Sequence, residues 1–180
     1  MRILLVDNND SFTRNLEHLL VAATGVAPVV APYAGLDGVD PRAWDMIVLS
    51  PGPGAPGEYP GHGRLLDAGV PVLGVCLGMQ AINAHFGGAT DRLDGCVHGR
   101  TDTIVWDGAP RLVARYHSLH ASRVADCLEV IAANAAGVPM ALRHRTLPIL
   151  GYQFHPESFL TPQGREFIDH ATLFFGLRRT

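Results

Sequence analysis

A single cysteine stands between two glycines in the segment Gly74-Val75-Cys76-Leu77-Gly78, directly after the apolar run 70–73. The pattern is the cysteine form of G-x-S-x-G, a strained strand-to-helix turn that exposes a nucleophile. The free N–H groups and positive dipole end of the following helix favour a thiolate over a thiol. A cysteine that only packs would be expected inside the strand. We therefore interpret Cys76 as a nucleophile, with the backbone N–H of Leu77 placed to stabilise an oxyanion.

A thiolate nucleophile needs a general base, and that base needs a group to orient it. Among nine histidines, His155 stands out because it follows a predicted strand at 149–154. Pro156 ends that strand, and Glu157 can turn back to hold the imidazole. Taken alone, the segment is equally compatible with a solvated His and Glu. The other histidines with weaker contexts are interpreted as exposed or packing residues: His18, His62, His85, His144 and His170.

The segments that must position these residues alternate between apolar runs and helical patterns. We expect buried parallel strands at 2–6, 26–30, 46–49 and 70–75, a helix with its N-cap at Asp10-Ser11, and a short helix at 63–68. Repeated strand–helix–strand units imply right-handed crossovers and a parallel sheet covered on both faces.

Shorter segments follow in the second half, at 101–106, 111–116, 128–133, 140–144 and 149–154. We expect them to form a mixed or antiparallel extension of the sheet. The fold class is therefore predicted as α/β, an open and mostly parallel sheet with helices on both faces and a small antiparallel extension in the C-terminal half. With no internal repeat or linker, residues 1–180 are predicted to form one domain.

Ligands of open α/β sheets bind at the carboxyl ends of the strands. Four segments are expected there: 7–11, 50–54, Cys76 and 155–157. The Gly/Pro-rich stretch SPGPGAPG matches neither common phosphate-binding pattern. Its prolines make it stiff and its glycines allow close backbone approach, which suits a second oxyanion N–H near Gly54. An ordinary rigid loop is the alternative.

Composition excludes several classes of function. Charged residues make up 17% of the chain, the net charge is −3, and no Lys/Arg-rich block occurs, which argues against nucleic-acid and anionic-membrane surfaces. No apolar run approaches the roughly 18–20 residues of a membrane span, and the N-terminus lacks a signal-peptide pattern. Three cysteines without a C-x-x-C pair fit a reducing cytoplasm. Without HExxH or a Cys/His cluster, we expect no metal and no cofactor.

Seven blocks spread along the chain carry a family resemblance: residues 6–16, 49–58, 74–88, 97–101, 115–122, 140–144 and 151–164. They resemble the class I (triad-type) glutamine amidotransferases. GVCLGMQ and QFHPES are the most specific of these motifs. DNxDSFTxN, HGxT and RYHSL narrow the resemblance to the glutaminase subunit of anthranilate synthase or aminodeoxychorismate synthase.

The resemblance implies a reaction in which Cys76 attacks the side-chain amide of L-glutamine. His155 protonates the departing ammonia, Glu157 orients His155, and the N–H groups of Gly54 and Leu77 hold the oxyanion. A γ-glutamyl thioester forms and is hydrolysed to glutamate. The residues that the resemblance assigns to glutamine binding are Gly52, Pro53, Gly54, Gln80, Ser118 and Leu119.

The resemblance also implies a partner, a chorismate-binding synthase subunit on a separate polypeptide that receives the ammonia in a heterodimer or heterotetramer. The residues expected to communicate with it are Asn8, Asp10, Ser11, His98, Arg115 and His117. Asn9 departs from the family, which usually has an aromatic residue there, and the 101–115 region is shorter than usual.

Two alternatives remain. The first is a stand-alone γ-glutamyl hydrolase of the same fold, which the RYHSL and HGRT motifs disfavour. The second is a non-catalytic module, which the presence of Cys76, His155 and Glu157 disfavours. The product, whether anthranilate, aminodeoxychorismate or a phenazine-type precursor, stays open because the ring chemistry belongs to the partner.

Overall fold

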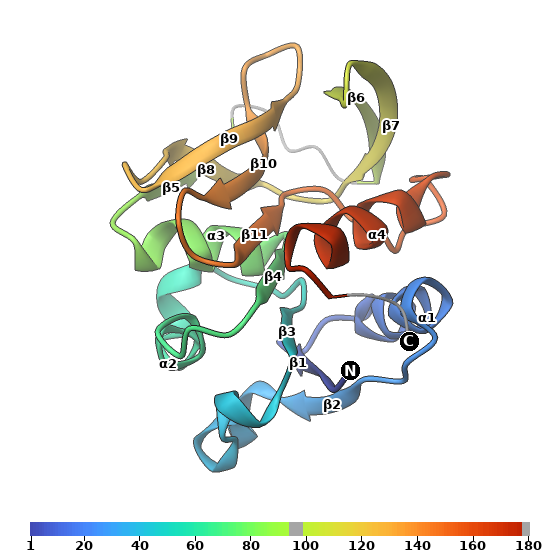
Figure 1. Ribbon diagram of the computed structural model, residues 1–180. Coiled ribbons are helices and arrows are strands. Elements are labelled where there is room, and N and C mark those ends of the chain that lie inside the picture. The colour runs from blue at the N-terminus through green and yellow to red at the C-terminus, as the bar shows by residue number, and fades with distance from the viewer. Residues whose placement is uncertain (94–98, 178–180) are drawn as a thin grey trace.

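A computed structural model describes residues 1–93 and 99–177 (Figure 1). Its centre is a seven-stranded sheet in the order β2-β1-β3-β4-β11-β10-β9. The strands are β1 (Ile3–Asp7), β2 (Val29–Pro32), β3 (Met46–Leu49), β4 (Val72–Val75), β9 (Leu128–Ala133), β10 (Pro139–His144) and β11 (Ile149–Tyr152). The first five strands in this order, β2, β1, β3, β4 and β11, pair in parallel with one another. Strand β10 pairs antiparallel with both β11 and β9. The predicted fold class is confirmed.

Helices cover both faces of this sheet. They are α1 (Thr13–Thr24), α2 (His62–Leu66), α3 (Leu77–His85) and α4 (Gly164–Phe174), with 3₁₀ turns η1 (Tyr33–Gly38), η2 (Pro41–Ala43) and η3 (Pro56–Glu58). Alternate residues of each strand point to opposite faces, so Ile3 packs with α1 and α4 while Leu4 packs with α2 and α3. Two hydrophobic cores result, one on each side of the sheet. In the described residues no helix has the length and apolarity needed to cross a membrane.

Two small antiparallel sheets stand apart from the central one. They pair β5 (Ala89–Arg92) with β8 (Leu119–Arg123), and β6 (Arg100–Trp106) with β7 (Ala109–Arg115). The expectation that segments 101–106 and 111–116 extend the main sheet is therefore wrong. Asp107 and Gly108 both have positive φ, 48° and 76°, so they form a two-residue hairpin turn that pairs these segments with each other.

Several element boundaries differ from the sequence expectation. Strand β2 begins three residues later than the predicted 26–30 and β4 two residues later than 70–75, while α2 spans five residues around the predicted 63–68. Helix α1 begins at Thr13, and the Asp10 carboxylate accepts the N–H of Phe12 at 2.8 Å just before it. The predicted capping residue thus stabilises the approach to the helix rather than its first turn.

Helix α3 crosses the sheet unusually closely, and glycines make this possible. A Cβ added to Gly74 in β4 would lie 2.5 Å from the carbonyl oxygen of Gly78 in α3. One added to Gly78 would lie 2.8 Å from Leu49 Cβ in β3. The atoms that an added Cβ would meet belong mostly to the backbone, so they cannot shift aside as the end of a flexible side chain could. The first turn of α3 is therefore pressed directly onto β3 and β4.

We expect Gly74→Ala to destabilise the protein by about 1–3 kcal/mol, because the added methyl group overpacks a backbone contact. Gly38→Ala is the matched control, since nothing lies within 4 Å of its added Cβ. Urea unfolding followed by circular dichroism measures both. Equal stability of the two variants would contradict the close crossing.

Candidate active site

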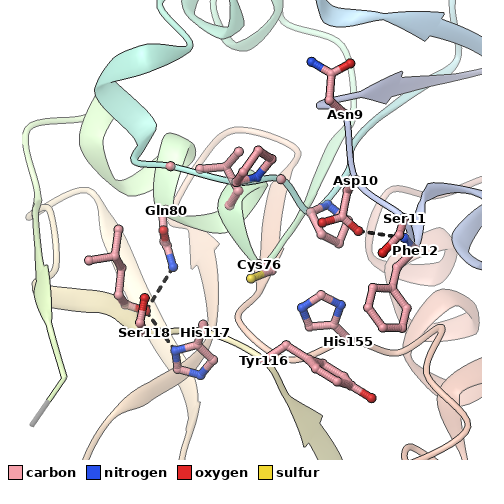
Figure 2. Close-up of a pocket in the computed structure, with 16 residues that line it drawn as sticks. Asn9, Asp10, Ser11, Phe12, Cys76, Gln80, Tyr116, His117, Ser118 and His155 are labelled. Carbon is pink, nitrogen blue, oxygen red and sulfur yellow. Dashed lines mark hydrogen bonds between the residues drawn. The ribbon is translucent and has the colours of Figure 1, made fainter. Parts of the chain in front are cut away.

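The loops after β1, β3, β4 and β11 meet at one edge of the sheet and enclose a pocket of about 500 Å³ (Figure 2). All four segments expected at this edge contribute to its lining, through Asp10, Gly52, Cys76 and His155 among others. The predicted convergence is confirmed. A fifth wall comes from residues 116–119, which follow β7 and end at the first residue of β8, and these include the predicted Ser118 and Leu119.

Cys76 sits in the strained turn that its sequence pattern predicts. Its φ and ψ are 54° and −104°, a left-handed conformation that non-glycine residues rarely adopt. Its N–H donates to the carbonyl of Tyr152 at 2.7 Å, and its carbonyl accepts from Gln80 at 3.1 Å to close the first turn of α3. As the first helical residue, Leu77 has an N–H with no acceptor inside the helix. Leu77 lines the pocket next to Cys76.

His155 and Glu157 form a buried pair. The His155 Nδ1 lies 2.7 Å from Glu157 Oε1, and the side chains are 3% and 0% exposed. The other ring nitrogen, Nε2, is buried without a hydrogen-bond partner, and His155 neighbours Cys76 in the pocket (Figure 2). Burial alone would lower the pKa of His155, but the interaction with Cys76 and the hydrogen bond and charge of Glu157 together raise that pKa well above its ordinary value. The imidazole is thus arranged to carry a proton next to the sulfur.

Two aromatic side chains hold the imidazole from the side. The ring centroids of Phe12 and Tyr116 lie 5.4 Å and 4.9 Å from that of His155, both edge-on. The Tyr116 hydroxyl lies 3.0 Å from Ser158 Oγ. Sequence reasoning did not single out either aromatic, although both fall inside the blocks 6–16 and 115–122.

The Gly/Pro-rich loop is held rigidly over the pocket. Glu58 accepts the N–H of Ala55 at 2.7 Å, and the Tyr59 hydroxyl donates to the Pro53 carbonyl at 3.0 Å. Gly54 has a φ of 74°, which an L side chain would strain. Gly52 packs so closely that an added Cβ would lie 2.5 Å from Leu77 Cδ2. The loop thus lies against the first residue of α3, as a second oxyanion donor at Gly54 would require.

A buried polar network anchors this loop from below. The N–H and amide of Asn8 donate to Ser50 Oγ and the Ser50 carbonyl at 3.0 and 2.8 Å. Because that amide nitrogen is a donor, Asn8 Oδ1 is left to accept from His62 Nε2 at 3.0 Å. Burial lowers the pKa of His62 to about 4, so the ring is neutral near pH 7. Its interpretation as a packing residue agrees with this burial.

A second network lies behind residues 116–119. Arg115 is 7% exposed and donates to Asp102 at 2.7 Å and to His117 Nε2 at 3.1 Å. His117 Nδ1 therefore donates to the Leu119 carbonyl, at 2.8 Å. Burial first, and then the charge of Arg115, lower the pKa of His117 to about 4. This ring too is a neutral part of the scaffold.

Three of the residues expected to communicate with a partner belong to these internal networks. Asn8, Arg115 and His117 are 0%, 7% and 3% exposed, so their side chains support the loops of the site, and their part in communication with a partner stays a prediction. Their polar character reflects internal pairing. Asp10 and Ser11 line the pocket and are at least partly exposed, and their role in communication with a partner stays a prediction. His98 lies outside the described residues.

Gln80 lines the pocket as predicted, but its amide group is already engaged. Its Nε2 donates to the Leu119 carbonyl at 3.1 Å and to Gln153 Oε1 at 3.2 Å, which leaves Oε1 as its free polar atom (Figure 2). Gln153 in turn places its Nε2 3.7 Å from Cys76 Sγ. Sequence reasoning did not assign a role to Gln153, and the signal available was its place two residues before His155, directly after β11.

Comparison with known proteins identifies the family. Residues 4–173 match the family model described as Glutamine amidotransferase class-I. The chain belongs to this family. It is also 38% identical to an aminodeoxychorismate/anthranilate synthase component 2 from Bacillus subtilis, over 92% of this chain and 93% of that protein. The fold resembles a crystal structure from Thermoplasma acidophilum described as a candidate GMP synthase subunit, with a TM-score of 0.82, 25% identity, and coverage of 98% of this chain and 94% of that one.

Other relatives of this amidotransferase chain are much longer. It is 43% identical to an aminodeoxychorismate synthase from Streptomyces griseus, over 93% of this chain and 25% of that protein. It is 42% identical to an anthranilate synthase from Azospirillum brasilense, over 91% of this chain and 24% of that protein. The chain thus spans about a quarter of the length of these curated relatives.

We expect acid to destabilise the fold through His62 and His117. Their pKa values are lowered to about 4, below the unfolded value of about 6.5, so the unfolded chain binds protons first. Their contribution to stability is present above about pH 6.5 and is lost as the pH falls towards 4. Each histidine accounts for up to about 3 kcal/mol of that loss.

The measurement is urea unfolding between pH 7 and pH 4. His62→Gln keeps a donor for Asn8 but cannot titrate, so the pH dependence of its unfolding free energy should be shallower than that of the wild type. His18→Gln, at an exposed position of α1, is the control and should leave the slope unchanged. Identical slopes for all three proteins would show that His62 is not held neutral by burial.

Proposed function

We propose that this chain hydrolyses the side-chain amide of L-glutamine and supplies the ammonia to a chorismate-aminating synthase. The observation that carries the proposal is the arrangement of Cys76 at a strained helix N-terminus beside His155, which Glu157 holds at 2.7 Å. Membership of the class I glutamine amidotransferase family supports the same chemistry.

In the first half of the reaction, the Cys76 thiolate attacks the amide carbon of glutamine and forms a C–S bond. The carbonyl oxygen becomes an oxyanion, which the N–H groups of Leu77 and Gly54 stabilise. His155 gives its proton to the amide nitrogen, the C–N bond breaks, and ammonia leaves. A γ-glutamyl thioester and a neutral imidazole remain.

In the second half, His155 takes a proton from a water molecule as that water attacks the thioester carbon. The C–S bond breaks, the thiolate is restored, and glutamate leaves after losing its acidic proton to solvent. Glu157 keeps the imidazole in the orientation that both proton transfers need. The Glu157 carboxylate also favours the protonated ring, which agrees with the raised pKa of His155.

Glutamine is proposed to lie between the Gly52-Pro53-Gly54 loop and the Ser118-Leu119 segment, which face each other across the pocket. The rigid loop places the amide carbon against Cys76, and backbone groups of both segments hold the substrate. Gln80 contributes through Oε1, since its amide nitrogen is engaged with Leu119 and Gln153. No metal or cofactor enters this mechanism.

The recipient of the ammonia is inferred from the names of the relatives, which are anthranilate synthase and aminodeoxychorismate synthase. The synthase is either a separate polypeptide, as the name component 2 indicates for the Bacillus subtilis relative, or a further part of a longer one. Anthranilate and aminodeoxychorismate are both compatible products, because the glutaminase site acts only on glutamine.

We expect Cys76→Ser to abolish glutamine-dependent amination of chorismate while ammonium salts still support it. The serine oxygen is a far weaker nucleophile at neutral pH, whereas the synthase site remains intact. The synthase is first recovered by affinity purification with the tagged chain and identified by mass spectrometry. Glutamate release and the aminated product are then measured with each nitrogen source.

Residual glutamine hydrolysis by the Cys76→Ser protein would contradict the mechanism. Brisk hydrolysis by the isolated wild-type chain, with no synthase recovered, would instead favour a stand-alone γ-glutamyl hydrolase. Formation of fluorescent anthranilate would assign the pair to anthranilate synthesis.

A further inference from the structure

Gln153 contacts the sulfur of Cys76 through its side-chain amide. It follows β11, is fully buried, and its Nε2 lies 3.7 Å from Sγ, within hydrogen-bond distance for sulfur. Its backbone N–H donates to the Met140 carbonyl at 2.9 Å, which ties the residue to β10. His155 also interacts with Cys76, and that interaction contributes to the raised pKa of the ring.

The orientation of the Gln153 amide follows from its neighbours. The Leu119 carbonyl is an acceptor only, so the Gln80 atom that faces it at 3.1 Å must be the NH₂ group. The same NH₂ group faces the Gln153 side-chain amide at 3.2 Å, so the Gln153 atom there must be the oxygen. The NH₂ group of Gln153 is therefore the one that points at the sulfur.

The chain of hydrogen bonds begins at groups whose donor and acceptor roles are fixed. The Leu119 carbonyl also accepts from His117 Nδ1 at 2.8 Å, and that nitrogen carries the proton because Arg115 donates to Nε2 on the other side of the ring. Each group in the chain thus has only one possible role as donor or acceptor. Reversing the Gln153 amide would place two donors, or two acceptors, against each other.

We propose that Gln153 is a further catalytic residue of the glutamine hydrolysis proposed above, on which this inference rests. It donates a hydrogen bond to the Cys76 sulfur, and Gln80 is the positioning residue that sets its orientation. A donor that points at a sulfur atom stabilises the thiolate relative to the thiol, and hydrogen bonds to charged groups are the stronger kind.

This donor would act in both halves of the reaction. In the first half, it holds the thiolate while the proton of His155 is kept for the departing ammonia. In the second half, it stabilises the thiolate as the C–S bond of the thioester breaks, so the sulfur is a better leaving group. His155 cannot stabilise the thiolate in every step, because it gives its proton to the departing ammonia and takes one back from water.

A role in packing alone would explain the burial of Gln153 equally well. The test must therefore measure how readily the sulfur of Cys76 forms the thiolate. Gln153→Met keeps a similar volume and removes the donor. It is made in a chain carrying Cys96→Ser and Cys127→Ser, so that Cys76 is the one remaining thiol. The rate of alkylation by iodoacetamide is measured from pH 5 to pH 9 by mass spectrometry.

We expect the half-maximal pH of alkylation to rise by about one unit in Gln153→Met, which is roughly a tenfold lower rate below that pH. The kcat for glutamine should fall while KM changes little, because the lost contact is with the sulfur. Gln163→Met is the matched control, since Gln163 is exposed at the N-cap of α4 and is not among the residues that line the pocket. It should leave both measurements unchanged.

Gln80→Met provides a second variant that leaves Gln153 in place. Without its orienting partner, the Gln153 amide is free to turn, so a smaller shift in the same direction is expected. The double variant should shift no further than Gln153→Met alone, because the two residues act through one hydrogen bond. Circular dichroism and thermal unfolding establish that each variant is folded.

An unchanged alkylation profile in folded Gln153→Met would overturn the proposal and leave Gln153 a packing residue. If Gln153→Met does not fold, an unchanged profile in Gln80→Met overturns the proposed positioning. Alkylation requires no glutamine, so this result is independent of the proposed function. A wild-type chain that hydrolyses no glutamine with its synthase would overturn that function, and with it the catalytic role of Gln153, whatever the profile.

Discussion

The close crossing of α3 over β3 and β4 is the constraint on which the site depends. Gly74 and Gly78 let the first turn of the helix rest directly on the sheet, and the chain must then reverse direction within one residue. Cys76 is that residue, with a φ of 54°. The strain is held by two cores that anchor β4 and α3. Its consequence is a cysteine at the N-terminus of α3 that lines the pocket.

Electrostatics separate the histidine that can do chemistry from those that support it. His62, His117 and His155 are all buried, and burial acts against the charged form of each ring. Burial lowers the pKa of His62, and burial first and then the charge of Arg115 lower that of His117. His155 faces the sulfur and a carboxylate, which outweigh burial, so its pKa rises. Burial thus keeps a ring neutral unless anionic neighbours oppose it.

Paired polar groups give the pocket its rigidity. One network fixes the Gly/Pro-rich loop through Asn8, and another fixes residues 116–119 through Arg115. The second reaches Cys76 through Gln80 and Gln153. Because a buried donor or acceptor left unpaired is costly, each member fixes the orientation of the next. A position that is polar in sequence can therefore be part of the interior, although it resembles a surface for a partner.

The sequence by itself determined the parallel α/β core, the elbow at Cys76, and the meeting of four strand-end loops. These follow from local patterns: apolar runs, glycine spacing, and the rule that parallel strands end at one edge. Only the tertiary structure decided that Asn8, Arg115 and His117 are buried, and that Gln153 faces the sulfur. Gln153 and Cys76 are 77 positions apart, and Gln80 and Leu119 are 39 apart. The partner of a polar side chain is set by which distant segments pack beside it, and no local pattern records that.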